Sequence, residues 1–275
     1  MIPQLQIACI DEQGLWEMET GGENRHKLFD HSQVPVTQGL ARDPSGTRFA
    51  MAVAPGLQYE YPYGLKVALT IGYPATQQLS PMQVPGLLPG GQYWPQFDRQ
   101  GAWIYFSQRL NDFDGTEIWR ARPDGSLAEQ LTQLATSYST DINPSPSPDG
   151  SRLVFATDRR DPHSGSFYEL ALLDLTTRVL TISAVRGVVP RWSPDGATIA
   201  YFDELGRIAL ANSSLTSARA LTAAPPFAGG LAWSADGNWL IAGRTEQGLS
   251  LVDAQTGAVL PLVHDPDCGQ AVFTP

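Results

Sequence analysis

The sequence is short of positive charge. It holds 18 lysine and arginine residues against 28 aspartate and glutamate residues, so its formal net charge is −10. Binding to the phosphate backbone of nucleic acid requires clustered basic side chains. We therefore expect no nucleic-acid partner.

Long apolar runs and a targeting segment are also missing. No stretch of the chain approaches the roughly 18 apolar residues that a membrane-spanning helix needs. The N-terminus lacks a basic region followed by an apolar core, the pattern of a signal peptide. We expect a soluble chain without membrane insertion, cytoplasmic as it stands, or periplasmic if it is a mature or trimmed form.

Common enzyme motifs are absent as well. The chain contains no G-x-S-x-G elbow, no phosphate-binding loop, no dinucleotide fingerprint and no C-x-x-C pair, each of which positions a reactive group in a known way. Asp149, Asp195 and Asp236 recur at the same place in a repeated turn, so a structural role is favoured for them. We expect no catalytic residue.

Glycine and proline are plentiful, with 26 and 22 residues, and are regularly spaced. The clearest repeated turn is Ser147-Pro148-Asp149-Gly150, which is followed by an apolar strand. Proline presets the second position of a type I turn and glycine suits the last. Related turns end at glycines 41 to 55 residues apart: Gly46, Gly101, Gly150, Gly196 and Gly237. This period suits one four-stranded propeller blade.

The predicted fold is all-β: a six-bladed β-propeller of four-stranded antiparallel blades. Residues 1–30 supply three strands and residues 268–275 supply one, so the C-terminal strand is expected to complete the N-terminal blade and close the ring. The remaining blades are predicted at residues 39–80, 92–132, 141–183, 187–222 and 228–263. We number the shared blade 1 and the others 2 to 6.

Ring closure also makes a prediction for the two cysteines. Matching Phe273 to Trp233, and Ile7-Ala8 to Ile241-Ala242, brings Cys9 and Cys268 face to face at the joint. A disulfide between them is one outcome, and two unrelated buried thiols are the other.

The repeated residues carry a family resemblance. Aromatic residues precede the turn at Phe97, Trp192, Trp233 and Phe273, and Leu-Thr pairs end two of the units. This pattern resembles the TolB-type Pro-Asp-Gly repeat, a WD40-like repeat of bacterial propellers. The resemblance implies a rigid scaffold that holds protein partners at the mouth of its channel, and we expect the chain to bind a protein or peptide as a monomer. Blades 2 and 3 depart from the pattern, with D-P-S-G and D-R-Q-G, and are expected to be irregular.

Loop lengths predict where a partner binds. Loops between second and third strands share a face with the loops between blades, and both kinds are long in blades 2 to 4. Aromatic residues and arginine, which binding hot spots favour, gather there. The predicted binding face comprises Tyr59, Tyr61, Tyr63, Arg109, Asp112, Phe113, Tyr138, Arg159, Arg160 and His163. The alternative for the tyrosines is that Tyr59 to Tyr63 form a short extra strand or pack over the edge of the blade.

Two other functions stay open. His31, His264, Asp265 and Asp267 flank the shared blade on inter-blade loops and could hold a divalent metal ion with imidazole and carboxylate ligands. Oligogalacturonate lyases, which resemble this repeat family, bind a metal through propeller histidines, so a metal-dependent or carbohydrate-active propeller is one alternative. A propeller that partners a separate peptidase chain is the other. For the favoured binding role, no cofactor is expected.

Overall fold

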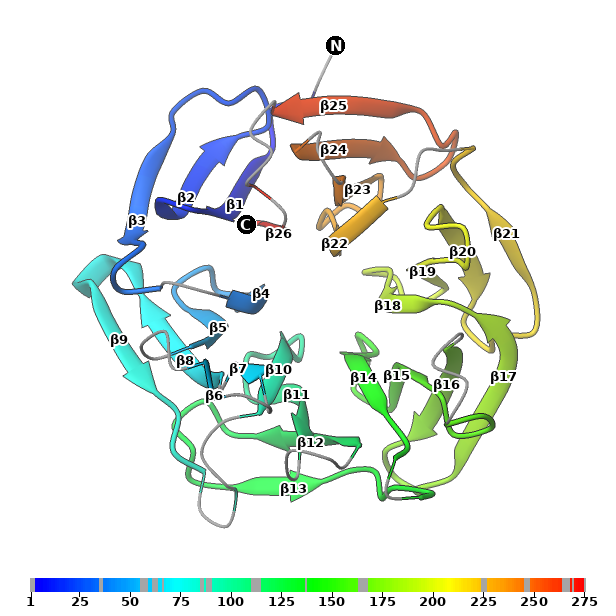
Figure 1. The fold of residues 1–275 in the computed structure, drawn as a ribbon. Helices are drawn as coiled ribbons and strands as arrows, with labels where there is room; N and C mark the ends of the chain where they lie inside the picture. Colours follow the sequence, from blue (N-terminus) through cyan, green and yellow to red (C-terminus); the bar gives the residue numbers. More distant parts are fainter. Residues whose placement is uncertain are drawn as a thin grey trace.

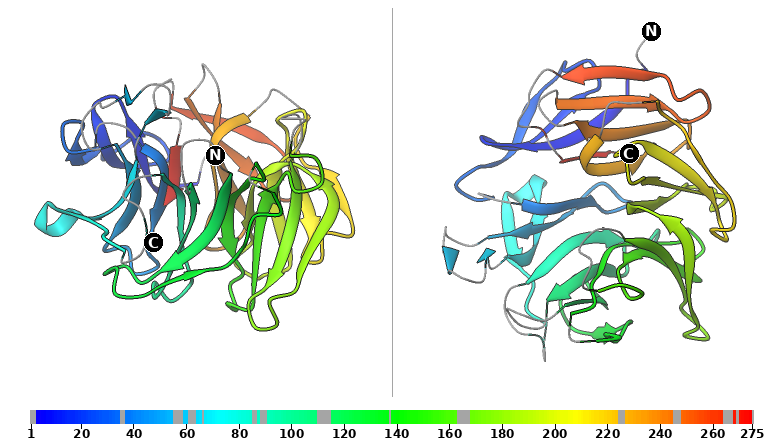
Figure 2. Two further views of the ribbon diagram at one scale, coloured as in Figure 1. Left: turned by 60° about the horizontal axis from the view of Figure 1, so that its bottom comes forward. Right: turned by 45° about the vertical axis from the view of Figure 1, so that its right-hand side comes forward.

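The computed structural model describes residues 3–34, 37–54, 59–60, 64–65, 67–84, 87, 91–109, 115–136, 138–162, 168–223, 227–244, 248–263, 268 and 270–274. Six four-stranded antiparallel sheets stand around a central axis (Figure 1). Two further views show the same ring, in which each sheet lies next to its neighbour around the axis (Figure 2). The predicted all-β, six-bladed propeller is therefore confirmed.

Blade 1 joins the two ends of the chain. From the centre outward it contains β26 (Gln270–Phe273), β1 (Gln6–Asp11), β2 (Gly14–Glu19) and β3 (His26–Asp30). Strand β26 pairs antiparallel with β1, with Ile7 opposite Phe273 and Cys9 opposite Ala271. The predicted closure by the C-terminal strand is confirmed.

The other five blades each use four strands in chain order, again from the centre outward. Blade 2 contains β4 (Thr37–Arg42), β5 (Phe49–Val53), β8 (Ala68–Tyr73) and β9 (Gln78–Pro81). Blade 3 contains β10 (Gln92–Phe97), β11 (Ile104–Arg109), β12 (Thr116–Ala121) and β13 (Ala128–Gln130). Blade 4 contains β14 (Asp141–Pro146), β15 (Arg152–Thr157), β16 (Glu169–Asp174) and β17 (Leu180–Arg186).

Blades 5 and 6 complete the ring. Blade 5 contains β18 (Val188–Trp192), β19 (Thr198–Phe202), β20 (Ile208–Asn212) and β21 (Ala218–Ala220). Blade 6 contains β22 (Phe227–Trp233), β23 (Trp239–Arg244), β24 (Gly248–Asp253) and β25 (Val259–Val263). The 3₁₀ turn η1 (Pro74–Thr76) links β8 to β9, and no helix in the described residues is long and apolar enough to cross a membrane.

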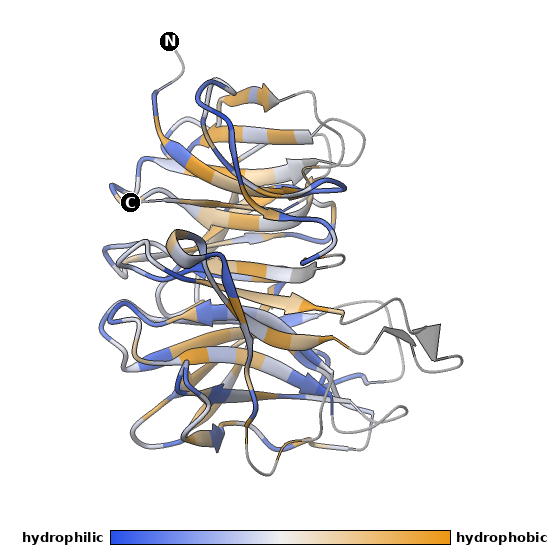
Figure 3. Cartoon of the chain, turned by 90° about the vertical axis from the view of Figure 1, so that its left-hand side faces the viewer, coloured by the Kyte–Doolittle hydropathy of each residue, from blue (hydrophilic) through white to orange (hydrophobic). Residues whose placement is uncertain are grey.

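The hydrophobic core of the described chain is divided among the gaps between neighbouring blades. One cluster, for example, joins Tyr105 and Ile118 of blade 3 to Phe155 and Leu173 of blade 4, and the other gaps hold similar clusters. A middle strand packs against a neighbouring blade on both faces, so its residues are nearly all apolar; β5 is buried along its whole length. Figure 3 shows hydrophobic residues within the strands and hydrophilic residues at many turns.

Blades 2 and 3 are regular, which corrects the prediction that they would be distorted. Their turns keep the same geometry with aspartate in the place of serine. Asp43 Oδ1 accepts a hydrogen bond from the backbone N–H of Arg48 at 2.9 Å, and Asp98 Oδ1 accepts one from Trp103 at 3.2 Å. In blades 4 to 6 a serine hydroxyl accepts this bond, as Ser147 Oγ does from Arg152 N–H at 2.9 Å. The turn requires an acceptor, and both residue types supply one.

Candidate binding site at the central channel

The channel is enclosed by the innermost strand of each blade: β26, β4, β10, β14, β18 and β22 (Figure 1). A cavity of about 310 Å³ lies among them. Its lining is mostly backbone and apolar side chain, and the residues that contribute are Gly39, Leu40, Trp94, Gln96, Ile142, Asn143, Val188, Val189, Arg191, Gly229, Gly230, Leu231, Ala232, Gln270, Ala271 and Val272. A volume of this size is at the lower end of those that hold small ligands or single side chains.

A β-bulge recurs at the same height in five inner strands. The pairing register shifts there in β4, β10, β14, β18 and β22. At each bulge one residue has a positive φ, and all of these residues line the cavity: Gly39, Trp94, Asn143, Val189 and Gly229. A bulge leaves the local ladder unpaired and re-aims the chain. The five bulges together therefore shape the channel wall.

Sequence reasoning missed this ring of bulges. The available signal was the residue that follows: Pro95, Pro144 and Pro190 stand directly after Trp94, Asn143 and Val189, and glycine takes the bulge position in two other blades. Proline within a strand is confined to edges and bulges. The same repeat position in successive blades thus marks a bulge in the strand nearest the axis.

Arg191 is the one charged residue among the described residues that line the cavity. It comes from β18, and its guanidinium donates to two backbone carbonyls, from Nε to Leu231 O at 3.1 Å and from Nη1 to Pro190 O at 2.8 Å. Arg191 is partly buried, and part of its surface stays accessible. Burial lowers the pKa of Arg191 to about 10, so the side chain is charged at neutral pH.

A polar network lies at the rim between blades 3 and 4, on the long-loop face. Arg159 holds the fully buried Asp141 with two bonds, from Nε at 2.9 Å and from Nη2 at 2.5 Å, and Nη2 also donates to Gln133 O at 2.6 Å. Burial raises the pKa of Glu117 and of Asp158 nearby. Arg159 therefore ties the inter-blade loop to blade 4 and balances part of a buried acidic cluster.

The other predicted face residues are placed in part. Arg160 is half-exposed and bonds Glu169 Oε1 at 2.9 Å and Ile182 O at 2.8 Å. Tyr138 is 57% exposed on the loop between blades 3 and 4. The Nε of Arg109, at the end of β11, is buried and has no hydrogen-bond partner within the described chain. Tyr61, Tyr63, Asp112, Phe113 and His163 lie outside the described residues.

The extra strand considered for the tyrosine segment is present at Tyr59. Strand β6 (Tyr59–Glu60) pairs with β7 (Gly64–Leu65), with Tyr59 opposite Leu65. This hairpin lies within the connection from β5 to β8, so blade 2 carries an addition that blades 5 and 6 lack in their described parts.

The predicted metal ligands are mostly outside the described residues, because His264, Asp265 and Asp267 fall there. His31 follows β3 and is exposed, with its backbone N–H bonded to Gln13 O at 2.9 Å. The described part of the chain contains no group of three or more histidine, cysteine, aspartate or glutamate side chains arranged to hold a metal ion.

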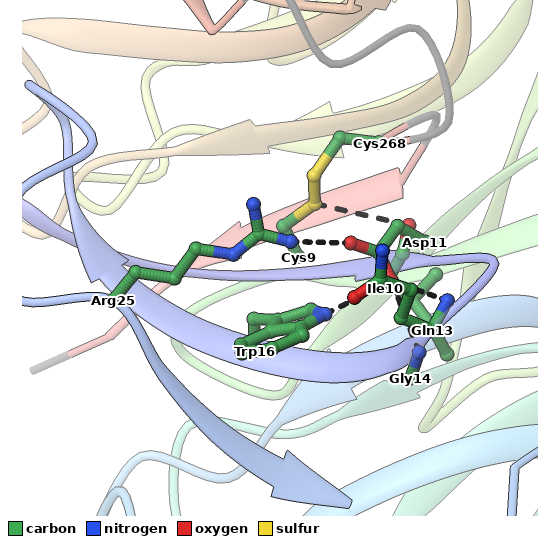
Figure 4. The surroundings of a disulfide bond; sticks show 8 residues. All are labelled: Cys9, Ile10, Asp11, Gln13, Gly14, Trp16, Arg25 and Cys268. Atoms are coloured by element: carbon green, nitrogen blue, oxygen red, sulfur yellow. Dashed lines mark hydrogen bonds and ion pairs between the residues drawn. A yellow bond between two sulfur atoms is a disulfide. The ribbon is translucent and has the colours of Figure 1, made fainter. Parts of the chain in front are cut away.

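The two cysteines meet at the closure of the ring (Figure 4). Cys9 and Cys268 are both fully buried, their Cα atoms are 5.9 Å apart, and they form a disulfide. They belong to the apolar cluster between blades 6 and 1. The predicted strand correspondence was wrong by one residue, because Phe273 pairs with Ile7 whereas Trp233 pairs with Leu240, not Ile241.

Comparisons with known proteins support the fold. The chain matches no family model. One curated relative, an uncharacterised protein of Agrobacterium fabrum, is 33% identical over 117 residues; the match covers 39% of this chain and only 38% of the relative's length. The identity is therefore confined to part of both proteins.

Solved structures resemble the chain along nearly its whole length. A nidogen/laminin complex structure matches with a TM-score of 0.75 and 11% identity, covering 98% of both chains. TolB from Acinetobacter baumannii matches at TM-score 0.69 and 15% identity, over 99% of this chain and 66% of TolB. A structure described as TolB, from Agrobacterium tumefaciens, matches at 0.67 and 14%, over 99% of both. The chain thus has a TolB-like β-propeller fold.

The same fold also occurs in enzymes. An oligogalacturonate lyase in complex with manganese matches at TM-score 0.54 and 15% identity, over 94% of this chain and 72% of the lyase. Fold likeness alone does not separate a binding protein from an enzyme. The residues of the site have to distinguish these two functions.

Proposed function

We propose that this chain is a non-catalytic binding protein that takes a protein or peptide ligand on its long-loop face and into the channel mouth. The observation that carries the proposal is the chemistry of the channel wall. Among the described residues, its lining contains no histidine, cysteine, serine, threonine, tyrosine, lysine, aspartate or glutamate. General acid–base and nucleophilic catalysis depend on these side chains.

The rim adds features typical of an interface. Tyr138 exposes a large aromatic surface, and Arg109 has an Nε that no described residue satisfies. Arginine and tyrosine are enriched at binding hot spots. Rigid blades carrying variable loops are also a common architecture for recognition.

The disulfide bears on where the protein works. Disulfides form and persist in oxidising compartments and are rare in the reducing cytosol. The buried Cys9–Cys268 bridge therefore favours an exported protein whose ring is sealed by the disulfide after export.

A peptide-display selection against the purified chain tests the binding role. We expect selected peptides to bind at least tenfold more weakly to Tyr138→Ala and Arg109→Glu. Leu127 and Val179 are exposed to a similar degree, 53% and 59%, but lie on turns at the opposite face, so Leu127→Ala and Val179→Ala serve as controls. Failure to select any peptide, or weaker binding only in the two control variants, would reject the proposal.

A further inference from the structure

The position of Arg191 in the repeat distinguishes blade 5 from the other blades. Arg191 stands two residues before the first residue of its turn, in Pro190-Arg191-Trp192-Ser193. The equivalent residues in the other blades are uncharged, and most are small: Ala41, Gln96, Ser145, Ala232 and Val272. A ring of six equivalent positions therefore carries one positive charge among short neutral side chains.

No carboxylate balances this charge. Arg191 has no ion pair within the described chain, and the cavity lining contains no aspartate or glutamate. Its Nε and Nη1 bond backbone carbonyls, whereas Nη2 has no hydrogen-bond partner among the described residues. Arg159, in contrast, is paired with the fully buried Asp141 at 2.5 Å. The absence is notable in a chain whose net charge is −10.

A partly desolvated charge without an ion-pair partner is costly to keep. Charges taken from water are normally paired or hydrogen-bonded, because the loss of hydration exceeds what carbonyl contacts return. A guanidinium with a free edge offers donors in the geometry that matches a carboxylate, and such charge-assisted bonds are among the strongest in proteins. The unused Nη2 thus points to an anionic ligand.

The rest of the wall limits what kind of anion fits. Asn143, Gln96 and Gln270 add neutral amides, and the remaining lining is apolar or backbone. A polyphosphate would need several cations, whereas a single carboxylate needs one. The cavity volume of about 310 Å³ suits a side chain or chain end.

We propose that Arg191 binds a carboxylate of the peptide ligand, carried by an acidic side chain or a C-terminus that enters the channel. This inference rests on the proposed binding function and adds the chemical class of the group that is recognised. Recognition of this kind makes the channel a specificity pocket beneath the long-loop face.

The first experiment uses a probe that needs no peptide. Trifluoroacetate is a carboxylate with a fluorine signal, and trifluoroethanol is its neutral counterpart. We expect the wild-type chain to broaden the ¹⁹F signal of trifluoroacetate but not that of trifluoroethanol. Equal broadening of both probes, or of neither, would overturn the inference.

Matched variants locate the effect. Arg191→Gln should reduce the broadening at least fivefold, and Arg191→Lys should retain part of it. Arg219→Gln removes the same charge from an exposed side chain on β21, the outermost strand of the same blade, and should leave the broadening unchanged. Equal loss in Arg219→Gln and Arg191→Gln would show a nonspecific charge effect and overturn the assignment.

The conservative variant covers the case in which Arg191→Gln fails to fold. Arg191→Lys keeps the positive charge on β18 but removes the guanidinium, whose Nε and Nη1 bond the carbonyls of Leu231 and Pro190. We expect it to broaden the trifluoroacetate signal at least twofold less than the wild type does; undiminished broadening would contradict recognition by the guanidinium of Arg191.

Selected peptides then separate the two proposals. Replacing the acidic residues of a bound peptide by amides, and its C-terminus by an amide, should weaken binding to the wild type at least tenfold but not weaken binding to Arg191→Gln further. Peptides that bind equally well to both proteins would reject the carboxylate site and leave the binding function standing. Arg191-dependent trifluoroacetate binding without any peptide binding would reject the peptide as the source.

Discussion

At the scale of single residues, the turn between the first two strands is held by side-chain hydrogen bonds as much as by its proline and glycine. In blade 5, Ser193 Oγ accepts from Thr198 N–H at 3.0 Å and donates to Asp195 Oδ1 at 2.5 Å. In blade 2 the roles are exchanged, because Asp43 accepts and Ser45 donates to it at 2.6 Å. The sequence predicts the turn but not the exchange of roles between serine and aspartate, because that exchange depends on the hydrogen-bond distances within the folded turn.

The exchange of serine and aspartate in the turn can be tested by measuring the free energy of unfolding of turn variants. Ser193→Ala should lower the free energy of unfolding by about 1–2 kcal/mol, because a backbone donor loses its acceptor. Ser193→Asp combined with Asp195→Ser reproduces the blade 2 turn, Asp43-Pro44-Ser45-Gly46, and should recover most of that loss. Urea unfolding measures all three proteins, and a double variant no better than Ser193→Ala would contradict the interpretation.

The aspartate of the turn also makes stability depend on pH. Hydrogen bonds from the Ser147 hydroxyl and the Ser151 backbone lower the pKa of Asp149 from 3.8 to about 2. A carboxyl whose pKa is lower in the folded chain stabilises it fully above about pH 4, and this contribution is lost as the pH falls toward 2. Asp149→Asn should therefore have a lower melting temperature at pH 7, and the difference should vanish near pH 2.

The control for this prediction is the donor. Ser147→Ala removes the first of the bonds, so the pKa of Asp149, followed by carbon-13 NMR, should rise toward 3.8. A constant gap in melting temperature from pH 7 to pH 2 would show that the carboxylate charge is not involved.

At the scale of strands, the sequence predicts the regular elements well and the inner bulges not at all. Strands such as Arg152–Thr157 and Thr198–Phe202 follow directly from the pattern, because each comes after a strong turn and alternates toward two packed faces. The bulges arise where six strands converge on the axis. That crowding is a property of the assembled ring, and the local sequence records it only as a glycine or a following proline.

One bulge carries evident backbone strain. Val189 has a φ of 55°, a region that costs a β-branched residue roughly 1–2 kcal/mol. Asparagine tolerates this region, and Asn143 occupies the equivalent place in blade 4 with the same φ of 55°. Val189→Asn should therefore raise the free energy of unfolding by about 0.5 kcal/mol, after the loss of some apolar burial.

Val188 is the matched control, because it is also partly buried, lines the same cavity and has no positive φ. Val188→Asn gains no strain relief and should cost about 1 kcal/mol in lost apolar burial. Urea unfolding compares the two variants. Equal destabilisation by both would mean that the positive φ at Val189 stores no energy.

At the scale of the whole molecule, counting strands predicts the closure of the ring, but not its register. A hairpin register is set by its turn, whereas β26 and β1 come from opposite ends of the chain and share none. The residues Ile7-Ala8 resemble Ile241-Ala242, yet the structure aligns Ile7 with Leu240. For the candidate site, composition and loop length predicted the long-loop face. The position of Arg191 in the channel could be recognised only once the structure placed its side chain.

The ring closure depends on a short strand and one covalent bond, so the bond should matter to global stability. The Cys9–Cys268 disulfide joins residues 259 positions apart, and closing so long a loop reduces the entropy of the unfolded chain. The chain-entropy treatment gives a stabilisation of about 5–6 kcal/mol for a loop of this length. Because both sulfurs are fully buried, reductant should act only when β26 opens.

We therefore expect reduction of the disulfide to lower the melting temperature. The reduction itself should be slow after reductant is added, and faster at higher incubation temperature, because β26 has to open first. Cys9→Ala with Cys268→Ala should reproduce the reduced protein and become insensitive to reductant. Thr274→Ala, at the end of the same strand, should leave reduction unchanged and controls for handling. Immediate loss of the bond in the cold, with no change in melting temperature, would show that the closure stands without it and that β26 alone holds the ring.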